Sequence, residues 1–182
     1  MRNAEPHATT ASKYKAPRRV ETQRLVLRPF EPADHARYAA ICADPDVMRY
    51  IGAGGANTPE VTWRSMSAML GHWEMLGYGL WAVELPGTGV IGHCGFIDVP
   101  GWPGFELGYL LGRDWWGQGF AREAASAALD VAYGTLGRDR VISLIRPPNE
   151  PSIRLVKSLG AAQEGEVDLL GAPPLVFVHA KR

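Results

Sequence analysis

A turn with two closely spaced glycines, residues 113–124 (RDWWGQGFAREA), precedes an alanine-rich helical pattern. Glycine permits a tight turn and lets a ligand approach the backbone closely. The unpaired N–H groups and the positive dipole end at the start of a helix attract anions. Arg122 would stand in the first helical turn, where a cation opposes the dipole, and this indicates a nearby anion. The stretch therefore fits either a plain strand-to-helix turn or a cradle for a phosphate group.

The segments on either side of this turn have different periodicities. Residues 78–85, 90–99 and 105–111 are strand candidates, and the turn signals between them predict antiparallel hairpins. After the turn the period becomes helical, with one apolar stripe formed by Ala121, Ala125, Ala128, Leu129, Ala132 and Leu136. Small alanines allow such a helix to lie close against a sheet.

The rest of the chain extends this alternation. Residues 22–28 predict a first strand, and two helices follow, the second starting at Thr58 and Pro59 and ending near Gly77. Further strands are expected at 140–145, 162–168 and 174–180, with a helix that ends near residue 160. The order βααβββαβαββ predicts one α/β domain over residues 20–182, with a mixed sheet and helices on both faces.

Composition excludes several classes of protein. The length of 182 residues suits a single domain, and no run of about 18 apolar residues predicts a membrane span. Cys42 and Cys94 form neither a disulfide framework nor a CxxC metal pair, so we expect no metal site. The first ten residues lack the apolar segment of a secretory signal, and we expect a cytoplasmic protein.

The charge is unevenly distributed although the net charge is zero. Residues 1–19 carry five basic side chains and one acid, lack apolar periodicity, and predict a disordered basic tail. A basic tail can bind nucleic acid, but the remaining chain is mildly acidic, which disfavours a nucleic-acid-binding domain and suits a cationic acceptor.

Two common phosphate-binding motifs do not fit the glycine turn. A P-loop requires Lys after its last glycine, and Phe120 follows Gly119. A dinucleotide fingerprint requires glycine or alanine where Arg122 stands, and it belongs to a βαβ unit instead of a set of antiparallel hairpins.

Across residues 20–170 the sequence resembles the GNAT superfamily of N-acetyltransferases, and within it the RimJ/RimL-like branch. The resemblance rests on the order and spacing of TQRLVLRPF, GYGLWAVEL, TGVIGHCGF, FELGYLL, WWGQGFAREAASAALDVAY and RVISLIRPPNEPSIRLVKSLGA. It implies a GNAT-like, mostly antiparallel sheet and acetyl-CoA as cosubstrate. In that family acetyl-CoA lies in a V between two parallel strands that separate, with its pyrophosphate on the turn. A homodimer is a further family expectation.

The resemblance also implies cofactor-binding residues. The family pattern (Q/R)-x-x-G-x-(G/A) matches a stretch that starts with Trp where Gln or Arg is usual, namely Trp116, Gly117, Gln118, Gly119, Phe120 and Ala121. We expect residues Gln118 to Arg122 to bind the pyrophosphate, mostly through the main chain. Tyr109, Leu110 and Leu111 would pair with the pantetheine arm and polarise the thioester carbonyl.

Asn149 and Ser152 match the N-x-x-S of the family, which lines the far wall of the coenzyme A slot. The residues themselves leave a second interpretation open. Asn is a favoured N-cap, and Ser152 at the third helical position is compatible with a purely structural cap.

Acetyl transfer to an amine needs a base and donors for the oxyanion, and the leaving thiolate benefits from an acid. Glu106 is the candidate base, because its apolar strand would raise its pKa; the alternative is a carboxylate that faces solvent or pairs with arginine. Ser152 and Tyr109 are candidate acids, since Val156 stands where many family members have tyrosine.

The dipeptide His93-Cys94 invites a nucleophile assignment. Adjacent strand residues point to opposite faces, so we expect no cooperation between these two side chains. Among the tryptophans, Trp81 is predicted to lie in the core, and Trp63 and Trp73 are candidates for the wall of an acceptor pocket.

The sequence thus predicts an acetyl-CoA-dependent N-acetyltransferase that acts directly on a primary amine of a small molecule or a protein N-terminus. The alternative is a noncatalytic acyl-CoA-binding module on the same fold, because a fold does not fix a function.

Overall fold

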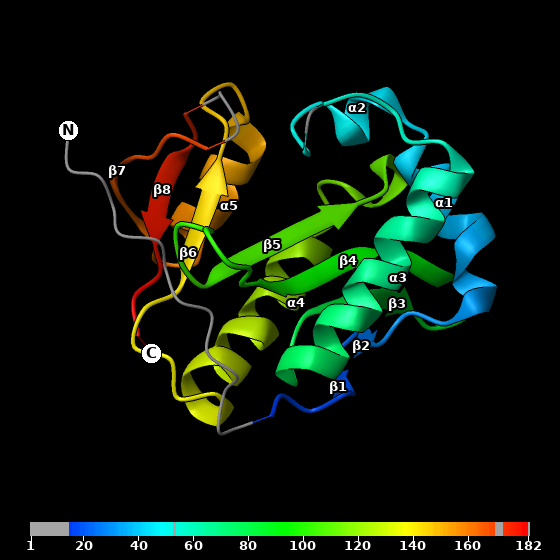
Figure 1. The fold of residues 1–182 in the computed structure, drawn as a ribbon, viewed down its shortest axis with the longest axis horizontal. Coiled ribbons are helices and arrows are strands. Elements are labelled where there is room, and N and C mark those ends of the chain that lie inside the picture. Colours follow the sequence, from blue (N-terminus) through cyan, green and yellow to red (C-terminus); the bar gives the residue numbers. More distant parts are fainter. Residues whose placement is uncertain (1–14, 53, 170–172, 182) are drawn as a thin grey trace.

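One mixed sheet of eight strands runs through the computed structural model, which describes residues 15–52, 54–169 and 173–181 (Figure 1). The strands are β1 (Val20–Glu21), β2 (Val26–Arg28), β3 (Leu80–Leu85), β4 (Gly89–Ile97), β5 (Glu106–Leu111), β6 (Ile142–Ile145), β7 (Ala162–Glu166) and β8 (Leu175–Val178). Their spatial order is β1-β2-β3-β4-β5-β6-β8-β7. Every neighbouring pair is antiparallel except β5 and β6, which are parallel, so the predicted mostly antiparallel sheet is confirmed.

Helices cover both faces of this sheet, as the sequence predicts (Figure 1). The helical segments are η1 (Pro32–Asp34), α1 (His35–Cys42), α2 (Pro45–Met48), α3 (Pro59–Leu76), η2 (Arg113–Trp115), α4 (Phe120–Asp130), the π-helical turn η3 (Val131–Thr135) and α5 (Glu150–Ser158). One face carries α1, α2 and α3, and the opposite face carries α4 and α5.

The alternation of side chains in the strands explains the two layers. On β3, Trp81 and Val83 pack into the core beneath α4, while Ala82 packs into the core beneath α1 and α3. On α4, the small residues Ala124 and Ala125 are fully buried, which lets this helix lie close to the sheet. The central strands are therefore buried on both faces.

The start and end of α3 follow the sequence signals. The Thr58 hydroxyl accepts a hydrogen bond from Val61 N at 3.3 Å, and Pro59 takes the first helical position. Gly77 ends the helix with φ of +77°, a left-handed conformation that favours glycine.

The first strand is shorter than predicted. A tight turn interrupts the expected strand 22–28, because the Thr22 hydroxyl accepts from Leu25 N at 2.9 Å and Thr22 N donates to Leu25 O at 2.9 Å. Two short strands, β1 and β2, therefore pair across this turn. The local hydrogen bonding of threonine prevails over the alternation of apolar residues.

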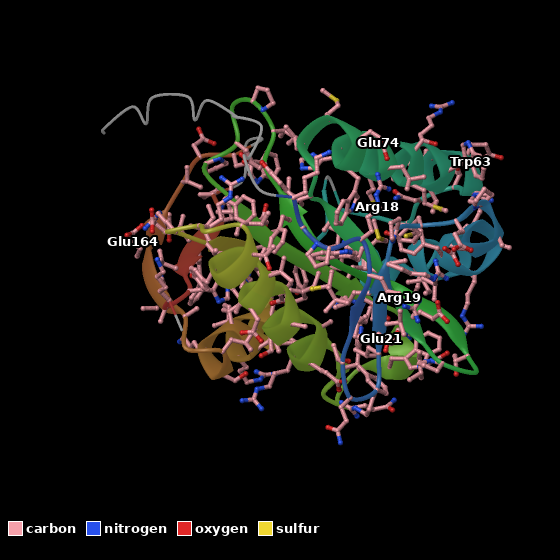
Figure 2. The ribbon with its side chains drawn as sticks, turned by 90° about the horizontal axis from the view of Figure 1, so that it is seen from below. Arg18, Arg19, Glu21, Trp63, Glu74 and Glu164 are labelled. Atoms are coloured by element: carbon pink, nitrogen blue, oxygen red, sulfur yellow. The ribbon has the colours of Figure 1, made fainter. Side chains whose placement is uncertain are left out.

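Residues 15–19 of the predicted disordered tail pack on the domain. Ala16 is buried and its N–H donates to Gly77 O at 2.9 Å, and Trp81 Nε1 donates to Pro17 O at 3.2 Å. Arg18 forms an ion pair with Glu74 of α3, and both are labelled in Figure 2. The tail boundary at residue 19 is thus wrong for these five residues, and residues 1–14 lie outside the described part.

The parallel strands β5 and β6 pair only at Glu106 and Ile142. Ile142 N donates to Phe105 O at 3.0 Å, after which the strands separate along their length (Figure 1). Beyond this point the Ser143 hydroxyl donates to Leu107 O at 2.8 Å, in place of a backbone ladder bond. The separation exposes the backbone edge of β5 at the centre of the sheet.

Gly95 of β4 provides a test of the close approach of β3 and β4. A Cβ atom there would lie 2.3 Å from Gly79 O and 2.9 Å from Leu80 Cα, and these backbone atoms have little freedom to move. We expect Gly95→Ala to lower the free energy of unfolding by about 3 kcal/mol or more in urea denaturation.

Gly165 of β7 is the matched control, since no atom lies within 4 Å of its added Cβ. Gly165→Ala should leave stability unchanged or raise it by up to about 1 kcal/mol. Equal stability of the two variants would contradict the predicted contact.

Candidate active site

Two cavities meet where β5 and β6 separate. The first, the α4 cavity, has a volume of about 680 Å³ and extends along β5 to the glycine turn and the start of α4. The second, the Glu106 cavity, has a volume of about 310 Å³ and contains Glu106. Both are lined by the same five residues at their junction, Tyr50, Ile51, Tyr109, Asn149 and Ser152. A molecule in one cavity can therefore contact a molecule in the other.

The N-terminus of α4 opens into the α4 cavity. Gly119 caps the helix with φ of +82°, and the first helical hydrogen bond at this end runs from Glu123 N to Gly119 O at 3.0 Å. The N–H groups of the first helical turn, at residues 120–122, have no carbonyl partner within the helix. They lie with the positive end of the helix dipole at the cavity, an arrangement that binds anions.

Arg24, from the turn before β2, holds the glycine turn in place. Its guanidinium donates to Gln118 O at 3.0 Å and to Glu123 at 2.7 Å, and it stacks over the Phe120 ring at 4.3 Å from the centroid. Glu123 in turn accepts from the Thr22 hydroxyl at 2.6 Å. These contacts fix the glycine turn and the start of α4 to the segment between β1 and β2.

The edge of β5 that faces β6 presents alternate backbone groups. Phe105 O and Leu107 O point toward β6, where they accept hydrogen bonds from Ile142 and Ser143. By alternation, the backbone groups of Tyr109 and Leu111 point to the same side. Tyr109 is therefore the residue whose main chain faces the gap most directly.

The backbone of Leu110 points away from the gap, unlike the backbones of Tyr109 and Leu111. A Cβ on Gly92 would lie 2.0 Å from Leu110 O, which places this carbonyl against β4. The expectation that Leu110 pairs through its backbone with a ligand is thus wrong for its carbonyl, although the residue lines the α4 cavity.

Trp116 has a role that its position in the family pattern does not reveal. Its indole Nε1 donates to Leu111 O at 2.7 Å, so it satisfies the carbonyl at the end of the exposed β5 edge. The side chain is 48% exposed and lines the α4 cavity. At this first position of the family pattern, Trp116 therefore supplies a hydrogen bond to β5 where Gln or Arg is usual.

Asn149 caps α5, as the structural interpretation of the sequence predicts. Its side-chain oxygen accepts from Ser152 N at 3.4 Å. The Tyr109 hydroxyl donates to Ser152 O at 3.3 Å and so links β5 to the first turn of α5. The cap and the cavity wall are therefore one structure, because the residues that cap α5 also line both cavities.

Most of the residues predicted to bind a cofactor line the α4 cavity. These are Tyr109, Leu110, Leu111, Trp116, Gly117, Gly119, Phe120, Ala121, Arg122, Asn149 and Ser152. Gln118 is absent from that lining. Its side chain donates to Asp114 O at 2.7 Å and its carbonyl accepts from Arg24, so both groups are used within the protein.

Glu106 is a buried carboxyl at the point where the two strands separate. Its side chain accepts from Trp102 Nε1 at 2.7 Å and from Leu144 N at 3.4 Å, and the residue is 7% exposed. Burial raises its pKa to about 7, against the opposing effect of these two donors. Glu106 thus neither faces solvent nor pairs with an arginine, and it can exchange a proton near neutral pH.

His93 and Cys94 point to opposite faces, as predicted. His93 lines the Glu106 cavity, contacts the Tyr38 hydroxyl through Nδ1 at 2.7 Å, and has a pKa lowered to about 4 by burial. Cys94 lies in the core beneath α4, where burial raises the pKa of its thiol to about 12. Neither group forms a nucleophile pair with the other.

The two α3 tryptophans do not line either cavity. Trp73 is buried and its indole donates to Leu80 O at 2.9 Å. Trp63 is 47% exposed on the outer face of α3, labelled in Figure 2, and packs edge-on against His35. The acceptor-wall interpretation of these residues is wrong, because α3 turns them toward the core and toward solvent.

Several site residues escape sequence reasoning. No local signal assigned Arg24, Trp102, Ser143 or Arg146 to the site, and the contacts of Arg24, Ser143 and Arg146 join segments far apart in the chain. Arg24 and Gln118, for example, are 94 positions apart. Only the proline and glycine turn at 100–104, which places Trp102 four residues before Glu106, offers a local signal.

Within residues 15–52, 54–169 and 173–181, no group of three or more His, Cys, Asp or Glu side chains is arranged to hold a metal ion. No helix in the same ranges is long and apolar enough to cross a membrane.

The bond between Trp102 and Glu106 makes the titration of Glu106 observable. We expect the Trp102 indole ¹⁵N–¹H resonance to shift with a midpoint near pH 7, because ionisation of Glu106 strengthens that bond. Glu106→Gln should remove the shift, and Trp102→Phe assigns the resonance.

The Trp73 indole, which is bonded to a backbone carbonyl, is the internal control and should not titrate. A Trp102 midpoint below pH 5 would show that burial does not raise the pKa of Glu106.

Comparisons with known proteins identify the family of this chain. The family model of the acetyltransferase (GNAT) domain matches residues 24–162. The chain is 34% identical over 147 residues to the uncharacterized N-acetyltransferase p20 of Bacillus licheniformis, covering 79% of this chain and 82% of that protein.

Solved structures show the same fold. An acetyltransferase from Agrobacterium tumefaciens superposes with a TM-score of 0.80 at 30% identity, covering 94% of this chain and 99% of that one. Mycobacterium smegmatis RimJ, in complex with CoA-disulfide, has a TM-score of 0.69 at 20% identity, covering 91% of this chain and 84% of that one.

The family uses acetyl-CoA, and its members act on amine acceptors. The family model matches more than half of this chain, and p20 and the Agrobacterium tumefaciens acetyltransferase are each at least 30% identical to it. The chain therefore belongs to the GNAT family of acetyltransferases.

Proposed function

We propose that the protein transfers an acetyl group from acetyl-CoA directly to a primary amine, of a small molecule or of a protein N-terminus. The observation that carries this proposal is the junction of the two cavities at the β5–β6 separation. One cavity ends at an anion-binding helix N-terminus, and the other contains a carboxyl that titrates near neutrality. A cosubstrate and an amine can thus meet at the exposed edge of β5.

Acetyl-CoA would occupy the α4 cavity. The N–H groups at 120–122 bind the pyrophosphate, and Arg122, which lines the cavity, adds a positive charge. The pantetheine arm pairs with the β5 edge at Tyr109 and Leu111 N, since the carbonyls of Leu107 and Leu111 already accept hydrogen bonds. Asn149 and Ser152 form the far wall.

Glu106 would act as the general base. A carboxyl with a pKa of about 7 is half ionised at neutral pH, where it can accept a proton from an ammonium group directly or through water. His93 in the same cavity does not suit this role, because burial keeps it neutral and a pKa near 4 makes it a weak base.

Tyr109 and Ser152 are the candidate acids for the departing thiolate. Both line the two cavities, and the Tyr109 hydroxyl is positioned by Ser152 O. Burial raises the pKa of Tyr109, so it remains protonated throughout the working range. Val156, where many family members have tyrosine, is fully buried in α5 and cannot act as an acid. A thiol with a pKa of about 8.5 also needs little help to leave.

The burial of the two cysteines supports direct transfer of the acetyl group. An acetyl-enzyme formed on cysteine would need a thiolate, and burial raises the pKa of both Cys42 and Cys94. Neither residue lines the α4 cavity or the Glu106 cavity. The two cysteines are therefore unsuited to act as nucleophiles, which supports direct attack by the acceptor amine.

We also propose that the chain belongs to the RimJ/RimL-like branch. The support is the run of residues 115–121, in which Trp116 takes the first position of the family loop pattern and still donates a hydrogen bond.

Glu106→Gln tests the base. We expect kcat to fall by about 10²- to 10⁴-fold while the Kd for coenzyme A stays unchanged, because Glu106 lies outside the α4 cavity. In the native enzyme kcat/KM should rise with pH through about 7, as Glu106 loses its proton.

Thiol release should be measured as a function of pH with amines of different pKa, because both Glu106 and the amine lose a proton as the pH rises. The midpoint that belongs to Glu106 stays the same when the acceptor changes, and the midpoint that belongs to the amine moves with the pKa of the amine. Glu164→Gln, at an exposed site on β7 labelled in Figure 2, is the matched control and should keep native rates. Native turnover in Glu106→Gln would remove Glu106 from the mechanism.

Arg122→Gln tests the anion site. We expect coenzyme A to bind about tenfold more weakly in calorimetry, because the variant loses one charge-assisted contact with phosphate. The loss should shrink as salt is added.

Arg64→Gln, an exposed charge removal on α3 outside both cavities, is the control and should leave the Kd unchanged. Equal affinities in the two variants would contradict the placement of the pyrophosphate at α4.

A further inference from the structure

Arg146 lies at the rim of the Glu106 cavity. It directly follows β6, is half-buried, and lines the cavity together with Glu106 and Tyr50. Its guanidinium donates to Gly52 O, in the loop between α2 and α3. This contact directs the head group across the cavity, from the sheet toward the helical layer. A guanidinium has five N–H donors, so most of them remain available to a ligand.

Arg146 has no acidic partner among the described residues. Most other arginines do, and carboxylates contact Arg18, Arg19, Arg24, Arg28, Arg49, Arg113, Arg138, Arg140 and Arg154. A guanidinium at the rim of an apolar cavity with no carboxylate partner is free to pair with an anionic ligand. A bound anion would complete this site.

The other walls of the Glu106 cavity carry little charge. They are mostly apolar, formed by Ile51, Ile97, Trp102, Leu107, Leu144, Ile145, Leu169 and Pro174. His93 is neutral because of its burial. Among the residues that line the cavity, Glu106 is the one acid and Arg146 the one permanent cation. The cavity therefore offers one group for an ammonium and one for an anion.

The spacing along β6 suits a small molecule with both charges. Glu106 accepts from Leu144 N at 3.4 Å, and Arg146 lies two residues further along the chain. Two residues of extended chain span about 7 Å, and both Leu144 and Arg146 line the cavity. A long arginine side chain can cover part of that distance. An amine at Glu106 and a carboxylate a few bonds away can thus be held at once.

We propose that the acceptor is a small amine that also carries a carboxylate, such as a free amino acid, and that Arg146 binds this carboxylate. The inference rests on the proposed amine acetylation at Glu106. The planar guanidinium matches a carboxylate through two parallel hydrogen bonds, which a lysine cannot reproduce. The volume of about 310 Å³ fits a ligand of this size.

Matched acceptors test the proposal. We would measure thiol release with acetyl-CoA for a panel of free amino acids, each paired with its decarboxylated amine and its amide. L-Leucine would be compared with 3-methylbutylamine and L-leucinamide, and L-phenylalanine with 2-phenylethylamine, using kcat/KM for the unprotonated amine. Wild-type protein should favour the best amino acid over its carboxylate-free partners by about tenfold to a hundredfold.

Variants at Arg146 then test whether this residue causes the preference for amino acids over carboxylate-free amines. Arg146→Gln should remove the discrimination by lowering kcat/KM for amino acids, while carboxylate-free amines keep their rates. Arg146→Lys should retain part of the discrimination, because lysine keeps the positive charge but lacks the planar guanidinium that forms two parallel hydrogen bonds. Arg64→Gln, outside the cavity, should behave as wild type.

Three results would overturn the proposal. One is a wild-type enzyme that acetylates decarboxylated amines as well as amino acids. Another is preference for peptides with a free N-terminus over the amino acids. The third is equal loss for both classes of acceptor in Arg146→Gln, which would mean that Arg146 only anchors the loop at Gly52.

Failure of the transferase function itself has a different signature, the absence of thiol release with every amine. Carboxylate recognition is then decided by calorimetry in the presence of coenzyme A. N-Acetyl-L-leucine, titrated against wild type and Arg146→Gln, is compared with N-(3-methylbutyl)acetamide. Binding of the carboxylate compound to wild type alone supports the role of Arg146, and absence of binding contradicts it.

Discussion

The separation of β5 from β6 after a single ladder pair is the constraint on which the site depends. A sheet interior normally pairs every backbone group, because unpaired buried groups cost free energy. Here the Ser143 hydroxyl and the Trp116 indole satisfy Leu107 O and Leu111 O, one at each end of the open edge. The backbone of Tyr109 remains between them. The gap is thus stabilised at its ends and left open where a ligand can pair with the strand.

The same separation determines the electrostatics of Glu106. The carboxyl lies at the closed end of the gap, where the two strands still touch, and burial there raises its pKa. Trp102 and Leu144 each donate one hydrogen bond, which stabilises the ionised form and limits the rise. A fully solvated carboxyl would be a weaker base, and a carboxyl without these donors would have a higher pKa. The two donors therefore keep the pKa in a useful range.

The glycine turn shows how much of the site the sequence could predict. Its two glycines, the following helix and Arg122 were sufficient to predict an anion site at the turn, and the capping role of Asn149 followed from its side chain alone. The direction of each backbone group was not predictable, because it depends on how β5 pairs with β4. Gln118 and Leu110 were assigned to the ligand for this reason, and the structure turns the Gln118 side chain and both carbonyls to other partners.

By itself the sequence determined most of the elements, their order and the residues of the turn, because these depend on local periodicity, capping and glycine conformation. Only the tertiary structure decided which residues meet across the gap. Arg24 reaches the turn from a position 94 residues away, and Arg146 reaches Gly52 across the same interval. Such contacts arise from the register and separation of whole strands, a property of the packed sheet that no short stretch of residues encodes.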